Sequence, residues 1–553
     1  SQQSVSSPSA SAPCPADSSP YPPLVAMLAL LSLLLLLHAS RVHGINEKLI
    51  ERIDAAVAVT NQTIDAIFQE WQIDKYPNFL QSVFMQRQSW ELMKLKFQQR
   101  ILSAQDGPAK FVISFSGSSV TAGHDSHYNK SAAVVVGDYM SASMSAIGIT
   151  LESRNVALGN NPCTPYDICI KTFAGLDADI VHWEQSYFCE GRPIVEMFIR
   201  QAMTTPSKPI IVFSESHTGK WNNKDCASKP KTHTLTQAET DMLHQDPSHL
   251  VSEGNKDQGH KRFQWLMEYV HHYHAAGLQL HSHTQCAEYA CLGPYIPTWM
   301  EGAASWHPSV IAHRMRAAHH AYFWLLAYRE ALTDLRKETT HRVVDAIKKD
   351  IDGHLDKLQG GPLLPAKHQS PFPDSAVCYT DYEPRFVRES SLRGQVVGGI
   401  SEDPAKGWTY LIYEDIVDHK LIERSLKQAY RDFKWLMYGN KGSGPLSVKV
   451  EVKREGPIFI CETPWIWGSL PKGFTHIRAD SVDVFLTINV LDTTNFKFEA
   501  DKAQKYNVQY DKSNELCVSV HPPSQPLTPP GTHVLTVVPT TDSKTIVAWV
   551  ITA

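Results

Sequence analysis

Short apolar runs alternate with amphipathic windows along the middle of the chain, and this alternation constrains the fold more than any other feature. The apolar runs cover 111–115, 149–157, 179–183, 209–213 and 278–282, and helical windows lie near 130–147, 191–203, 261–275 and 308–333. Strands separated by crossover helices pair in parallel. We therefore expect a doubly wound α/β sandwich within a domain over 107–358.

The sequence on either side of this region has a different character. Apolar residues at three- and four-residue steps predict a helical lead-in over 45–106. Glycines and prolines after 358 mark a boundary, and we expect a linker and helical connection over 359–440, with an amphipathic helix near 416–438. Alternation with period two then predicts a β-sandwich domain over 441–553.

The N-terminal region carries the signals that indicate a compartment. Residues 1–23 are rich in Ser and Pro and are expected to be disordered. The apolar run from Leu24 to Leu37 gives a helix of roughly 21 Å, shorter than a bilayer core of about 30 Å. Residues 24–40 therefore predict a signal peptide or, if uncleaved, a signal anchor. We expect a secreted protein or a type II single-pass membrane protein in the secretory pathway.

Sequons and cysteines agree with export. Asn61 and Asn129 each begin an N-glycosylation sequon. The ten cysteines predict disulfides in an exported chain, and two pairs are close enough in sequence to join locally: Cys163 with Cys169, and Cys286 with Cys291.

The net charge and the spacing of the histidines argue against a nucleic-acid-binding protein and against a metal site. The formal net charge is −5, with 52 basic and 57 acidic residues, so we expect no nucleic-acid partner. Histidines cluster at 271–274 and at 281 and 283, but no carboxylate stands at the spacing of a zinc-protease helix and no CxxC pair occurs. We therefore expect no metal site.

Small residues crowd the end of the first predicted strand, over 114–123. A serine at such a strand-to-helix turn lies over helix N–H groups, which favour the negative charge that develops during acyl transfer. A nucleotide-binding P-loop pattern is absent, and Thr121 occupies the last glycine position of a nucleophile-elbow motif.

Three segments resemble the SGNH (GDSL-type) hydrolases in order and spacing. The sequence SGSSVTAG over 116–123 is similar to the first block of that family and places Ser119 at the nucleophile, with Ser118 where the family has Asp. The segment over 155–162 looks like the second block, whose glycine N–H supports the oxyanion, and places Gly159 there. Trp306-His307-Pro308 resembles the last block and makes His307 the general base. The resemblance implies an SGNH-like three-layer αβα sandwich around a parallel sheet.

The sequence departs from the family pattern at two positions. Ala304 stands where the family has the Asp that orients the histidine, although Glu301 lies one turn further back. The third block, over 183–189, lacks the Asn that donates to the oxyanion; Gln185 or Asn161 is a candidate replacement. Loss of one oxyanion donor typically costs about 10²–10³ in rate.

Each candidate residue also has a purely structural interpretation. Ser119 can be a helix N-cap, and Gly159 can be a turn glycine with positive φ. His307 can be a helix-start residue bonded to a carbonyl, and Glu301 can be a solvated surface acid.

These observations predict a serine esterase that cleaves an O-acyl ester, with a carbohydrate O-acetyl group as the substrate suggested by the secretory setting. Ser119 attacks, His307 carries the proton, and the N–H groups of Ser119 and Gly159 hold the oxyanion. The partner is a small ester or glycan, and no cofactor is needed. Two alternatives remain open: a catalytically inactive SGNH-fold binding or assembly protein, and a Golgi O-acyltransferase that uses the same serine and histidine.

Overall fold

The computed structural model describes most of the chain outside its N-terminus and a set of internal segments. The residues described are 24–74, 79–80, 83–124, 128–159, 161, 163–185, 191–215, 261–282, 307–308, 310–341, 344–355, 361–365, 372–381, 391–403, 405–412, 435–462, 472–487, 504–506, 509–510, 517–520 and 527–553.

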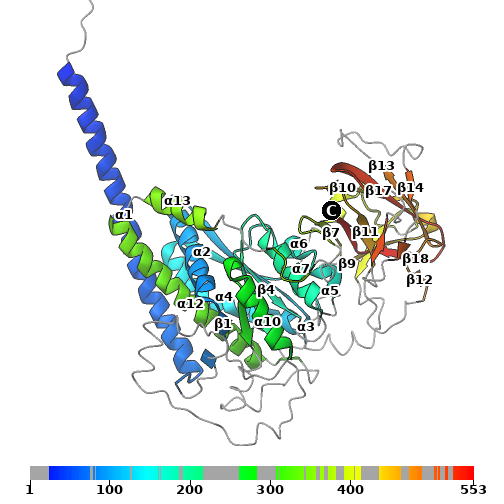
Figure 1. Ribbon diagram of the computed structural model, residues 1–553, viewed down its shortest axis with the longest axis horizontal. Helices are drawn as coiled ribbons and strands as arrows, with labels where there is room; N and C mark the ends of the chain where they lie inside the picture. Colours follow the sequence, from blue (N-terminus) through cyan, green and yellow to red (C-terminus); the bar gives the residue numbers. More distant parts are fainter. Residues whose placement is uncertain are drawn as a thin grey trace, which may run out of the picture. The chain divides into compact units, whose positions relative to one another are not determined.

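A predominantly parallel sheet forms the centre of the α/β region (Figure 1). Its strand order is β1-β6-β5-β4-β2-β3; β2 to β6 run parallel, and β1 pairs antiparallel with β6 at one edge. The strands are β1 (Val83–Met85), β2 (Ala109–Gly117), β3 (Ile149–Asn155), β4 (Ile180–Glu184), β5 (Ile210–Glu215) and β6 (Gln279–Ser282).

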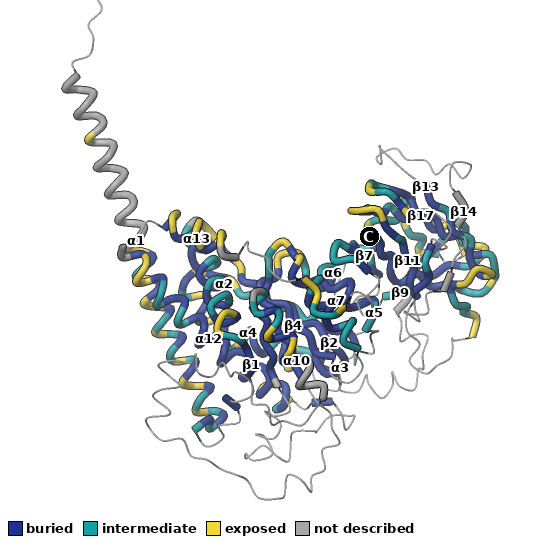
Figure 2. Tube along the Cα trace, in the orientation of Figure 1, coloured by how far each residue is buried: buried dark blue, intermediate teal, exposed yellow. Residues whose placement is uncertain are grey.

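Helices cover both faces of this sheet, which explains why its strands read as continuous apolar runs. Strands β4 and β5 are buried at every residue (Figure 2). On one face, Phe111 stacks on Phe97 with ring centroids 4.9 Å apart, and Phe115 lies 6.2 Å from Trp324. On the other face, Val112 and Trp183 join a separate core.

Two layers of helices pack on the two faces of the sheet. The first layer contains α2 (Arg87–Asp106), α4 (Ala132–Ile147) and α12 (Val310–His341), and α2 and α4 each pack against α12. The second contains α6 (Ile170–Ala174), α7 (Arg192–Met203) and α10 (Lys261–His272). The remaining helical elements are α1 (Leu24–Glu70), α3 (Ser119–Ala122), α5 (Cys163–Tyr166), α13 (Val344–Leu355), η2 (Tyr128–Lys130), η4 (His274–Ala276), η7 (Arg393–Gln395) and η8 (Lys441–Ser443).

The predicted α/β class with a parallel sheet is confirmed, and the region before the sheet differs in detail. The stretch read as a continuous helical lead-in holds two helices, α1 and α2, separated by the short strand β1. The three residues of β1 show no alternation of apolar and polar side chains from which a strand could be predicted. They form a strand because they pair with the free edge of β6. Among the described residues, no helix combines the length and apolarity needed to cross a membrane.

The C-terminal part consists of three further sheets. Their strand orders are β10-β17-β13-β14, β15-β16-β11-β19-β7 and β12-β18-β9-β8, antiparallel except between β12 and β18. The strands are β7 (Val377–Thr380), β8 (Thr409–Ile412), β9 (Trp435–Gly439), β10 (Leu446–Val452), β11 (Ile458–Cys461), β12 (Phe474–Thr475), β13 (Val482–Thr487), β14 (Gln504–Tyr506), β15 (Gln509–Tyr510), β16 (Cys517–Ser519), β17 (Gly531–Pro539), β18 (Lys544–Val547) and β19 (Trp549–Thr552). Val448, Leu535 and Ile460 belong to one core, so residues of two sheets pack against each other.

This β-region begins earlier than the sequence suggested. Strands β7, β8 and β9 come from the stretch expected to be a linker and helical connection. The helix predicted near 416–438 is wrong at its end, because Trp435–Gly439 is a strand that pairs with β8 and β18. The rest of that predicted helix lies outside the described residues.

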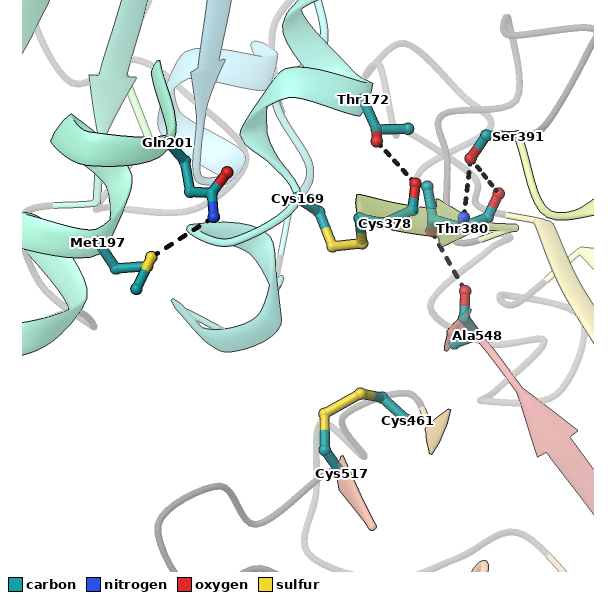
Figure 3. Close-up of a disulfide and its surroundings, with 10 residues drawn as sticks. All are labelled: Cys169, Thr172, Met197, Gln201, Cys378, Thr380, Ser391, Cys461, Cys517 and Ala548. Atoms are coloured by element: carbon teal, nitrogen blue, oxygen red, sulfur yellow. Dashed lines mark hydrogen bonds between the residues drawn. A yellow bond between two sulfur atoms is a disulfide. The ribbon is translucent and has the colours of Figure 1, made fainter. Parts of the chain in front are cut away.

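Disulfides are present, and one links the α/β region to the β-region. Cys169 beside α6 pairs with Cys378 in β7, and Cys461 pairs with Cys517 (Figure 3). The predicted local pairing of Cys163 with Cys169 is therefore wrong; Cys163 is itself disulfide-bonded. Cys286 and Cys291 lie outside the described residues.

Candidate active site

The candidate site lies where the strand order of the central sheet changes direction. Strand β2 has β3 on one side and β4 on the other. The connection after β2 passes through α4 on one face, whereas the connection after β3 passes through α6 on the opposite face. A crevice for ligands opens at the carboxyl ends of two such strands. Residues that follow β2 and end β4 therefore meet at this point.

A tight turn after β2 presents Ser119. Ser118 is the N-cap of α3, and its hydroxyl accepts a hydrogen bond from the N–H of Val120. Ser119 is the first residue of the helix, so the interpretation of Ser119 as the N-cap is wrong. Gly117 has no room for a side chain, because a Cβ there would lie 2.7 Å from the carbonyl oxygen of Glu184.

Glu184, at the end of β4, holds this turn from the neighbouring strand. Its Oε2 accepts hydrogen bonds from Ser118 Oγ at 2.8 Å and from Thr121 Oγ1 at 3.0 Å, and its carbonyl accepts from the N–H of Ser118 at 2.9 Å. The sequence pattern did not predict this role. The available signal was a carboxylate directly after the apolar run 179–183.

Ser119 and His307 meet, although 188 positions separate them in sequence. His307 Nε2 lies 2.9 Å from Ser119 Oγ. Both side chains are buried, with 8% and 3% of their surface exposed. His307 is fixed near the start of α12, which begins at Val310. Glu301 and Ala304 lie outside the described residues.

Gly159 lies in the segment that follows β3, against the ring of His124. The N–H of Leu158 donates to the carbonyl of Gly117 at 3.0 Å, which holds the segment against the end of β2. The φ angle of Gly159 is not in the left-handed region, so the interpretation as a positive-φ turn glycine is wrong. A Cβ at this position would overlap with the ring of His124, so a side chain here would displace that ring.

Asn161 and Gln185 hold the same segment. The Asn161 amide donates one hydrogen bond to Gly117 O at 2.8 Å and one to Leu158 O at 2.9 Å. Gln185 Nε2 donates to Asn161 Oδ1 at 2.6 Å. Both hydrogens of the Asn161 amide are thus directed at backbone carbonyls.

His124 is a second imidazole at the site, and the sequence pattern did not predict it. Its ring centroid lies 5.7 Å from that of His307, in an edge-to-face arrangement, and the side chain is buried. A histidine immediately after the glycine that ends the first block was the available signal.

The electrostatics beneath the site favour neutral histidines. Burial lowers the pKa of His182 to about 4, although Glu184 acts in the opposite direction. Burial also lowers the pKa of His313 to about 3, and Arg316 and His307 add to this effect. No group of three or more His, Cys, Asp or Glu side chains in the described ranges is arranged to hold a metal ion.

The two predicted glycosylation sites differ in setting. Asn129 lies in η2 and is exposed. Asn61 lies within α1, is half-buried, and accepts a hydrogen bond from Arg329.

The fold and the site together define an α/β protein with a serine–histidine pair at its switch point, an arrangement that can carry out nucleophilic acyl transfer. The chain matches no protein-family model, and no curated protein matches its sequence. Two solved structures of a two-domain esterase active on acetylated mannans, one co-crystallised with mannopentaose, resemble it at TM-scores of 0.38 and 0.36. Each is 13% identical and covers 80% of this chain and 91% of its own.

Proposed function

We propose that this protein is a serine esterase of the SGNH type, with Ser119 as nucleophile and His307 as general base. The observation that carries the proposal is the 2.9 Å approach of Ser119 Oγ to His307 Nε2 at the carboxyl end of β2. A nucleophile and base within hydrogen-bond reach, at the ligand crevice of an α/β sheet, are the parts that acyl transfer needs.

The reaction proceeds in two halves. Ser119 Oγ attacks the acyl carbon, its proton passes to His307 Nε2, and the carbonyl electron pair moves onto oxygen. The N–H groups of Ser119 and Gly159 stabilise this oxyanion. The alcohol then leaves with the proton from His307, and water releases the acyl group by the same route in reverse. No cofactor takes part.

The compartment suggests the class of alcohol. Disulfides persist in oxidising compartments, and the chain contains at least two in addition to the one at Cys163. The exposed sequon at Asn129 fits the same setting. We therefore propose an O-acyl ester of a carbohydrate as the substrate, with action in the secretory pathway or outside the cell.

Hydrolysis of p-nitrophenyl acetate by the full chain tests the proposal. We expect Ser119→Ala and His307→Gln to lower kcat by on the order of 10⁴–10⁶, the loss seen when members of a triad are removed. The matched control is Ser141→Ala, which removes a serine hydroxyl that only bonds the Gly137 carbonyl within α4, and it should retain full activity. Folded wild-type protein with no hydrolysis would instead indicate an inactive binding protein.

A further inference from the structure

The backbone after Ser119 folds back so that His124 lies next to the nucleophile. Gly123 adopts the left-handed conformation with φ of 88°. The N–H of His124 donates to Ser119 O at 3.0 Å, and the N–H of Gly123 donates to Val120 O at 3.3 Å. This pair of bonds is a Schellman motif, which ends a helix by reversing the chain. The position of His124 is therefore set by the same short helix that presents Ser119.

The ring of His124 lies between Gly159 and the ring of His307. A Cβ on Gly159 would lie 2.7 Å from His124 Nε2 and 2.9 Å from Nδ1, so the edge of the ring that carries both nitrogens faces Gly159. The ring also meets His307 edge to face, and His307 in turn contacts Ser119 Oγ. His124, Gly159, His307 and Ser119 are thus contiguous.

The side chains expected to replace the missing oxyanion donor are used elsewhere. Both hydrogens of the Asn161 amide go to backbone carbonyls. Gln185 donates to Asn161. These bonds keep the Gly159 segment in place and occupy both hydrogens of the Asn161 amide and one of the two hydrogens of the Gln185 amide. The ring of His124, by contrast, lies directly against Gly159.

We infer that His124 is a catalytic residue that donates an imidazole N–H to the oxyanion, and this inference rests on the proposed esterase function. When Ser119 Oγ bonds to the acyl carbon, the C=O π bond breaks and its electron pair moves to oxygen. The Ser119 proton goes to His307, while His124 keeps its proton and only donates a hydrogen bond. An electrostatic donor of this kind typically contributes about 10²–10³ in kcat.

Three substitutions distinguish hydrogen-bond donation by His124 from packing of its ring. His124→Phe keeps a ring against Gly159 but has no N–H, His124→Gln keeps an N–H donor but loses the ring, and His124→Ala loses both. With p-nitrophenyl acetate, we expect the Phe and Ala variants to have a kcat lower by about 10²–10³ with KM nearly unchanged. The kcat of the Gln variant should lie within about tenfold of the wild-type value. His533→Gln, which changes a histidine of β17 bonded to Pro529 O, is the control and should behave as wild type.

The opposite ranking would overturn the inference: near wild-type kcat in His124→Phe or His124→Ala means that the ring only packs. A measurement on wild-type protein covers the case in which a variant fails to fold. Phenylboronic acid forms a tetrahedral adduct with a nucleophilic serine, and ¹⁵N-histidine NMR should show the His124 N–H become protected from exchange when the adduct forms. An adduct without this protection would also overturn the inference. Failure of the proposed function looks different, because then wild-type protein neither hydrolyses the ester nor binds the boronic acid.

Discussion

Two hydroxyl groups and one buried carboxyl fix the position of the Ser119 turn. Ser118 stands where the SGNH family, which this segment resembles, has Asp, and its hydroxyl donates a hydrogen bond to Glu184 of the neighbouring strand. Thr121, the third residue of α3, donates to the same oxygen. The turn is therefore held across β2 and β4, and in the proposed reaction Glu184 is a residue that positions Ser119.

Glu184→Ala should reduce both stability and activity. The substitution leaves the Ser118 and Thr121 hydroxyls without this acceptor in a buried site, at a cost of about 1–3 kcal/mol for each group. We expect a lower free energy of unfolding in urea and a lower kcat with little change in KM. Glu152→Ala is the control, because Glu152 pairs with Lys110 and Arg154 near the surface and such pairs contribute about 0–1 kcal/mol. Equal losses in the two variants would show that Glu184 does not hold the turn.

Among the elements, the parallel strands were the most predictable part of the fold. Strands β2, β4 and β5 are buried on both faces, so each appears in the sequence as a short apolar run between helical windows, whereas β3 at the edge of the sheet is mostly half-buried. The strand β9 was misread as the end of a helix, because a short apolar run such as 435–438 has no periodicity that separates the two. Strand β1 depends on an edge that only tertiary structure provides.

The candidate site was predictable to a similar, limited extent. Ser119, Gly159 and His307 stand in segments whose pattern resembles a known family. Glu184 and His124 are brought to the site by contacts with Thr121 of α3 and with Gly159, which no local pattern reveals. Helix α12 and the strands facing it add a further feature of this kind, a group of buried histidines. The ring centroids of His182 and His320 lie 5.2 Å apart, and those of His281 and His320 lie 4.6 Å apart.

These histidines should make the α/β region sensitive to acid. Burial lowers the pKa of His319 to about 3, and that of His182 to about 4, whereas an unfolded histidine titrates near 6.5. Between these values the unfolded state binds more protons, so the stability is complete above about pH 6.5 and is lost as the pH falls toward 4. We expect the free energy of unfolding to drop between pH 7.5 and 5 by roughly 2 kcal/mol per such histidine.

His319→Gln tests this origin, because it removes one proton-linked group from the buried set. Urea unfolding at pH 7.5 and 5 should show a smaller acid-induced loss in the variant than in wild type, by roughly 2 kcal/mol. A loss of the same size in both proteins, or a stability that rises toward pH 5, would contradict this account.

At the scale of the whole molecule, the β-region is bound to the second helical layer by shared packing as well as by a covalent link. Phe198 of α7 and Trp549 of β19 belong to one buried core. Arg200 bonds the carboxylate of Asp374, with its Nε 2.8 Å from Oδ1. Thr172 Oγ1 donates to Cys378 O beside the disulfide from Cys169 (Figure 3). We therefore expect the two regions to unfold together.

Removal of the two disulfides should have unequal effects. Cys169 and Cys378 are 209 positions apart, whereas Cys461 and Cys517 are 56 apart. Because the entropy lost by the unfolded chain grows with the logarithm of loop length, Cys169→Ala/Cys378→Ala should cost about 1 kcal/mol more than Cys461→Ala/Cys517→Ala. Urea unfolding of the two double variants measures the difference. A larger loss in the Cys461 and Cys517 variant would contradict the expectation.

The covalent labelling of Ser119 by a fluorophosphonate tests the central claim most directly, since this reagent adds only to a serine activated by its surroundings. Mass spectrometry of digested full-length protein should find the adduct on the peptide that contains Ser119. Folded His307→Gln, which lacks the base 2.9 Å from the hydroxyl, should show almost none. Folded wild-type protein with no adduct on Ser119, or with the adduct on another serine, would contradict the account.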